Sequence, residues 1–150
     1  MTQAPGCTNL KIAAIWCFLA GVFMILMSFI RAAFGMAIRD ELGATVEGTF
    51  LIVYSVITLV IAFYYVMMGV IAARHGKNLA KANSLRTLAT ISLVIGVGLV
   101  VFETIMLGFS ILAIIMLFDL IRSYLYLRGA TRNRETNPNT LDNNVYDRLT

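Results

Sequence analysis

Charged residues and histidine are both scarce in this chain, and each shortage limits what the protein can be. Asp, Glu, Lys and Arg make up 13% of its 150 residues, whereas hydrophobic residues make up 59%. A soluble globular domain usually carries about 25% charged residues, so a water-soluble core of this size is excluded. The single histidine, His75, lies in a basic segment. A haem-binding bundle would need histidines inside the membrane, so this class is also disfavoured.

Cysteine is equally scarce, because the chain has only Cys7 and Cys17. Two cysteines are too few for a disulfide framework. They do not form the Cys-x-x-Cys pair that a quinone-linked thiol oxidoreductase needs. We therefore expect no enzymatic activity, no cofactor and no metal site. The net charge of +4 is better explained by the cytoplasmic loops of a membrane protein than by binding to nucleic acid.

Long apolar runs are what the chain has in quantity. Residues 12–30 and 50–73 are nearly free of charge, and residues 87–127 are long enough to cross a bilayer twice. Roughly 20 apolar residues span the hydrocarbon, where each backbone N–H and C=O needs an internal partner, so these runs must be helical. The first run is longer than the roughly 7–15 residues of a signal-peptide core, and we expect it to be retained.

The third run is expected to form a helical hairpin. A single helix over residues 87–127 would be about 60 Å long, which is twice the thickness of the bilayer core. The favoured turn lies at residues 107–110, where Gly108 relieves the backbone. One alternative turns at Glu103 and Thr104, and another is a single bent helix that leaves three spans.

These patterns predict an all-α integral membrane protein, a four-transmembrane-helix bundle built from two helical hairpins. The expected parts are a short N-terminus at residues 1–11, a transmembrane domain at residues 12–128 with spans at 12–30, 50–73, 86–106 and 110–127, and a disordered tail at residues 129–150. After the first span the helix is expected to continue toward Leu42 and to stop at Gly43.

Basic residues set the expected orientation. The second connection carries Arg74, Lys77, Lys81 and Arg86, and three more arginines follow the last span. By the positive-inside rule, this basic loop and both termini lie in the cytoplasm. The loop could also hold an anionic lipid headgroup, although topology alone explains its charge.

Small residues at helical spacing mark the faces on which the helices are expected to pack. Close approach at small side chains drives association in lipid, because burial of apolar surface alone does not. The expected packing residues are Ala13, Cys17 and Gly21 in the first span, Ser55, Ala62 and Gly69 in the second, and Ala89, Ser92 and Gly96 in the third. These faces serve the bundle itself, or one of them meets a partner protein or a second copy.

Three ionisable residues lie at membrane depth, where a charge is costly and usually has a purpose. Glu103 shares a helical face with Gly96 and Ser92, whereas Asp119 is three residues before Arg122 and can form an ion pair within its helix. In one interpretation Glu103 or Asp119 binds a proton or cation during transport. In the other, Asp119 and Arg122 neutralise each other and Glu103 is a hydrated carboxylate near the outer surface.

The function expected from these features is non-enzymatic. A small tetraspan protein with short outer loops and packing stripes suits association with membrane partners during assembly or trafficking. The segment from Tyr146 to Leu149 resembles a tyrosine-based sorting signal, in which a Tyr and a bulky apolar residue enter two pockets. The alternative is a small ion- or proton-coupled transporter or channel subunit that uses Glu103 and Asp119. Four-span proton-coupled exporters carry an acid in the first span, and residues 12–30 have none.

Overall fold

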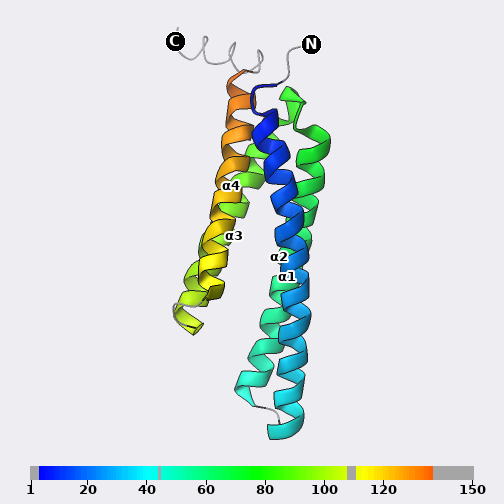
Figure 1. Cartoon of the computed structure of the whole chain (residues 1–150), viewed down its shortest axis with the longest axis vertical. Coiled ribbons are helices and arrows are strands. Elements are labelled where there is room, and N and C mark those ends of the chain that lie inside the picture. The colour runs from blue at the N-terminus through cyan, green and yellow to red at the C-terminus, as the bar shows by residue number, and fades with distance from the viewer. Residues whose placement is uncertain (1–3, 44, 108–110, 137–150) are drawn as a thin grey trace, which may run out of the picture. The chain divides into compact units, whose positions relative to one another are not determined.

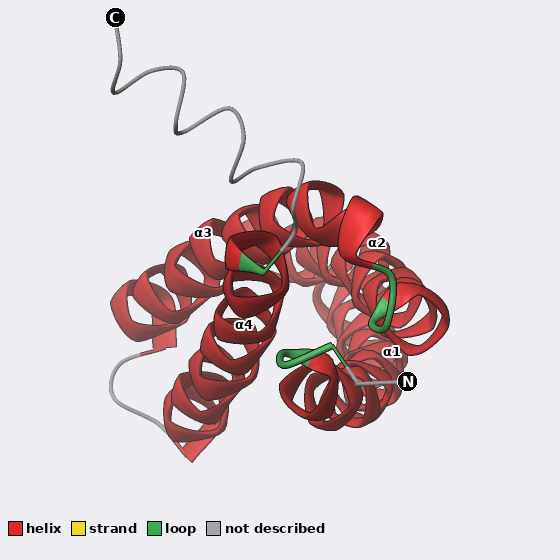
Figure 2. Cartoon of the chain, turned by 90° about the horizontal axis from the view of Figure 1, so that it is seen from above, coloured by secondary structure: helices red, strands yellow, loops and turns green. Residues whose placement is uncertain are grey.

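The described part of the chain is entirely helical apart from short turns. A computed structural model describes residues 4–43, 45–107 and 111–136, with the backbone alone for residues 106–107 and 111–116. The helices are α1 (Cys7–Leu42), α2 (Val46–His75), the 3₁₀ helix η1 (Leu79–Lys81), α3 (Ala82–Leu107) and α4 (Ile111–Glu135) (Figures 1 and 2). No strand occurs in these residues, so the predicted all-α class is confirmed.

Three segments among the described residues are long and apolar enough to cross a membrane, namely α1, α2 and Leu79–Ile105, which covers η1 and most of α3. They fit an integral membrane protein. The expected fourth span, residues 110–127, lies mostly within α4, which also carries Asp119, Arg122 and the basic residues near its end. Of the expected turn at residues 107–110, only Leu107 lies within the described residues, where it ends α3.

The first interhelical turn follows the sequence closely. Helix α1 ends at Leu42, and Gly43 has a φ of 78°, the left-handed conformation that glycine adopts without a Cβ clash. The predicted stop at Gly43 is therefore confirmed. The amide of Thr45 donates to the Gly43 carbonyl at 2.7 Å, and the Thr45 hydroxyl accepts from the Gly48 amide at 3.2 Å, which caps the start of α2.

The described chain divides into two compact units, Met1–Trp16 with Met68–Thr150, and Cys17–Met67. In the second unit, α1 and α2 approach each other at glycines. A Cβ on Gly35 would lie 2.9 Å from the Gly48 carbonyl oxygen, and one on Gly48 would lie 3.0 Å from that of Gly35. Deeper in the unit, the hydroxyls of Ser28 and Thr58 are 2.8 Å apart. Small and hydroxyl side chains therefore make this contact, as expected for helices in lipid.

In the first unit α3 and α4 lie side by side (Figure 1). The end of α4 also meets the start of α1, at Leu10, and the turn directly after α2, at Gly76. The amide of Asn133 makes this three-way junction. Its Oδ1 accepts from the Gly6 amide at 2.7 Å, and its Nδ2 donates to the Gly76 carbonyl at 2.9 Å. We call Gly6, Leu10, Gly76, Gly129 and Asn133 the Asn133 junction.

The predicted start of the disordered tail is too early in the chain. Disorder was predicted from Gly129 onward, but α4 continues to Glu135, and Gly129, Ala130 and Asn133 are buried. The physical reason is tertiary. Gly129 leaves room for the backbone of Gly6, and Asn133 replaces the water that a polar side chain would otherwise bind. Composition alone does not reveal either contact.

Replacing Gly129 by alanine tests this close approach. The added Cβ would lie 2.9 Å from Leu10 Cγ and 3.0 Å from the Gly6 carbonyl oxygen, and overpacking of this kind costs about 1–3 kcal/mol. We expect Gly129→Ala to lower the free energy of unfolding by that amount in reversible unfolding of the detergent-purified protein. Gly98→Ala is the matched control, because no atom lies within 4 Å of its added Cβ. It should be neutral or stabilising by up to about 1 kcal/mol. Equal effects of the two variants would contradict the junction.

Candidate functional site

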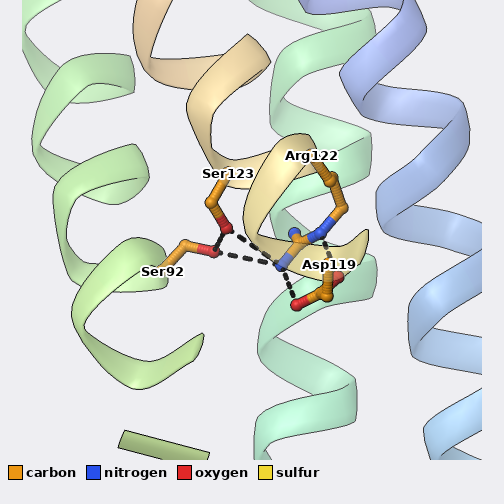
Figure 3. Close-up of polar contacts among 4 residues, drawn as sticks. All are labelled: Ser92, Asp119, Arg122 and Ser123. Carbon is orange, nitrogen blue, oxygen red and sulfur yellow. Dashed lines mark hydrogen bonds and ion pairs between the residues drawn. The ribbon is translucent and has the colours of Figure 1, made fainter. Parts of the chain in front are cut away.

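A polar cluster lies between α3 and α4, centred on Arg122 (Figure 3). Arg122 Nε donates to Asp119 Oδ1 at 2.6 Å, and Nη2 donates to Asp119 Oδ2 at 2.8 Å. The two residues are three apart on α4 and therefore share one face of the helix. The ion pair expected from their spacing is present, and it has the bidentate geometry that gives the strongest arginine–carboxylate contacts.

Two serines complete the cluster and connect α4 to α3. Arg122 Nη2 lies 3.2 Å from Ser92 Oγ on α3 and 3.3 Å from Ser123 Oγ on α4, and the two hydroxyls are 3.0 Å apart. Figure 3 shows the guanidinium between the Asp119 carboxylate and the serine pair. Sequence reasoning placed Ser92 only on a packing face, and it missed Ser123. The signal for Ser123 was its position directly after an arginine at membrane depth.

The two partners of the ion pair are buried to different extents. The side chain of Arg122 is 1% exposed and that of Asp119 is 19% exposed. An arginine in this position cannot lose its proton at physiological pH, so its charge has to be balanced in place, and Asp119 balances it. This arrangement is a cross-link with its charges neutralised. Both oxygens of the Asp119 carboxylate are occupied by the guanidinium, so the pair joins two residues of α4 and, through Ser92, joins α4 to α3.

Glu103 differs from one of its expected descriptions. The prediction that Glu103 is a hydrated carboxylate near the outer surface is wrong with respect to its exposure, because the Glu103 residue on α3 is 1% exposed. The sequence placed Glu103 on the face of Ser92 and Gly96, and those two residues are buried as well. The face of α3 that carries Glu103 is therefore an inward one. The helical spacing of Glu103 from Ser92 and Gly96 predicts its burial better than its estimated distance from the end of the span does.

The small residues named as packing positions all lie inside the structure. All nine are buried, namely Ala13, Cys17, Gly21, Ser55, Ala62, Gly69, Ala89, Ser92 and Gly96. Within the second unit, a Cβ on Gly21 would lie 3.1 Å from the Ala62 carbonyl oxygen, so two of these residues meet directly. Their burial indicates that the chain uses these residues for its own packing.

The remaining candidates lie elsewhere. Arg74, Lys77, Lys81 and Arg86 are exposed around the connection between α2 and α3. Tyr146 and Leu149, the two residues of the sorting pattern, lie outside the described residues. Among the residues that are described, no group of three or more His, Cys, Asp or Glu side chains could hold a metal ion.

A double-mutant cycle tests whether Asp119 balances the charge of Arg122. Asp119→Leu leaves a buried guanidinium without its carboxylate, and breaking a buried pair in this way costs about 3–5 kcal/mol. Replacing both partners, Asp119→Leu with Arg122→Met, removes the uncompensated charge and should recover most of that loss. Ser123→Ala is the control for the hydrogen bonds, with an expected cost near 0.6 kcal/mol. The measurement is reversible unfolding in detergent. A double variant no more stable than Asp119→Leu would show that the pair is not coupled.

Comparison with known proteins adds no relative from which a role can be transferred. No protein-family model matches the chain, and neither a curated protein nor a solved structure matches it.

Proposed function

We propose that the chain is a non-enzymatic membrane protein of four spans that binds other membrane proteins and takes part in their assembly or trafficking. Both termini and the basic connection lie on the cytoplasmic side. The observation that carries the proposal is the Asp119–Arg122 ion pair. Its two side chains bind each other, and Arg122 also donates a hydrogen bond to Ser92. The ionisable groups of α4 that lie within the expected span serve the packing of the protein, and this favours a structural role over transport.

The same ion pair supports α4 as the fourth span. A lone charge in the middle of a membrane helix costs several kcal/mol. A pair that neutralises both charges and donates to a neighbouring helix lowers that cost, so residues 111–127 can cross the bilayer despite Asp119 and Arg122. An even number of spans returns both termini to one side, in agreement with the positions of the basic residues.

One face of α4 is available to a partner. Leu117, Phe118, Ile121 and Tyr124 are 42%, 64%, 54% and 55% exposed. The small packing residues are buried within the chain itself and are not available to a partner. We therefore assign partner contact to the apolar face of α4 formed by these four residues, which we call the α4 face. Its partner is a transmembrane helix of another protein or of a second copy of the chain.

Co-purification tests this assignment. We expect the protein, extracted in mild detergent, to be recovered with a stoichiometric membrane partner or as a homo-oligomer. Changing the α4 face by Phe118→Ala with Ile121→Ala should remove most of the partner, because these side chains bury apolar area against it. The matched control is Val94→Ala with Val97→Ala on α3, where the side chains are 67% and 46% exposed. Mass photometry and quantitative mass spectrometry measure the ratio. Recovery of the wild-type chain as a monomer without a partner would contradict the proposal.

A transport role remains as the second candidate because Glu103 is buried in a helix long and apolar enough to cross a membrane. A buried carboxylate in such a helix is usually retained for a purpose. Under the proposal made here, reconstituted liposomes show no proton or cation flux above that of protein-free liposomes. A flux that Glu103→Gln abolishes, and that Gly98→Ala leaves intact, would establish transport and overturn the organising role. Asp119→Asn, measured in parallel, would show whether the ion pair takes part.

A further inference from the structure

One end of the first unit gathers positive charge from three separate stretches of the chain. Its exposed basic residues are Lys11 on α1, Arg74 on α2, Lys77 in the turn, Lys81 in η1, Arg86 on α3, and Arg128 and Arg132 on α4. We call these residues the basic end. Among the described acids of the unit, Glu103 is buried and Asp119 is paired with Arg122, which leaves Glu135 as the exposed acid.

The Asn133 junction places these charges together. Lys11 follows Leu10, Lys77 follows Gly76, Arg128 precedes Gly129, and Arg132 precedes Asn133. Their neighbours in sequence are in direct contact. Asn133 bonds to Gly6 and Gly76, while a Cβ on Gly129 would lie 2.9 Å from Leu10. Helix η1, which carries Lys81, contacts both α3 and α4. Figure 1 shows the start of α1, the turn after α2, and the end of α4 at the same end of this unit.

Such a concentration of like charge is unfavourable unless anions lie beside it. Two unit charges at a few ångströms repel each other even near water, and among the residues that the structure describes this end has seven exposed cations and one exposed acid. The apolar segments begin close by, since the candidate span Leu79–Ile105 includes Lys81 and Arg86 in its first turns. When this segment crosses a bilayer, basic residues in its first turns lie at the level of the lipid headgroups.

We infer that the basic end binds the headgroups of anionic phospholipids in the leaflet that it faces. Juxtamembrane lysines and arginines attract such lipids, and here the tertiary structure joins three stretches of the chain into one surface. The phosphate of the lipid accepts from the ammonium and guanidinium groups, while its acyl chains lie along the exposed apolar side chains of α1 and α3. This inference concerns lipid and does not depend on a protein partner.

Native mass spectrometry of the full chain in detergent tests the inference, with phosphatidylglycerol and phosphatidylcholine as the two probes. We expect tighter binding of phosphatidylglycerol, weakened by added salt because exposed charges are screened. Each neutralised residue should weaken binding up to about fivefold. The variant with Lys77→Gln, Lys81→Gln, Arg128→Gln and Arg132→Gln should lose the preference.

Three controls keep the result interpretable. Arg39→Gln removes one exposed charge outside the basic end and should retain the preference for phosphatidylglycerol. Lys81→Gln alone should weaken that preference, and it replaces the fourfold variant if the latter does not fold. Lys77→Arg with Lys81→Arg keeps the charge and should behave as wild type. Glycerol 3-phosphate tests whether a soluble phosphate suffices. Equal binding of the two lipids, a preference that survives neutralisation, or glycerol 3-phosphate binding as tightly as the lipid would each overturn the inference.

Discussion

The structure depends on one constraint, which is that a polar group outside water needs a partner within the chain. For the backbone this constraint produces helices, because they satisfy every internal N–H and C=O without a neighbouring strand. For the side chains it produces pairs and clusters, such as Ser28 with Thr58 in one unit and Ser92, Ser123, Asp119 and Arg122 in the other. At the junction it makes the amide of Asn133 use both its oxygen and its nitrogen on backbone groups of other segments.

Glycine and hydroxyl residues carry the contacts that apolar side chains cannot provide in lipid. Two leucines gain little by meeting each other in a medium of acyl chains, whereas two backbones that approach at Gly35 and Gly48 gain close packing over several turns. The same device recurs at Gly129, which lies against Gly6 and Leu10. Many large apolar side chains accordingly face outward, and the interior combines small, polar and aromatic residues with a few large aliphatic ones such as Leu10, Met68 and Leu85.

The ionisable residues of the described chain fall into an interior group and an exposed group. Inside the helices, Arg122 is balanced by Asp119 and Glu103 is buried, so the ionisable groups at that depth belong to the interior. At the end of the first unit, the lysines and arginines are exposed and outnumber the acids. The interior charges support an organising role in which the protein is a stable scaffold. The exposed charges and the apolar α4 face are the surfaces that we propose for contact with lipid and with a partner protein.

Apolar runs and small-residue spacing were enough to predict the helical class, the stop at Gly43 and the pairing of Asp119 with Arg122, because each depends on residues that are adjacent or within one helical turn. The continuation of α4 beyond Gly129 and the roles of Ser123 and Asn133 were decided only by the tertiary structure. Each of these depends on a group supplied by a segment far away in the chain, as when Gly6 lies 127 residues from the asparagine that binds it. Local pattern determines which helices form, and contact between distant segments determines which polar groups become part of the interior.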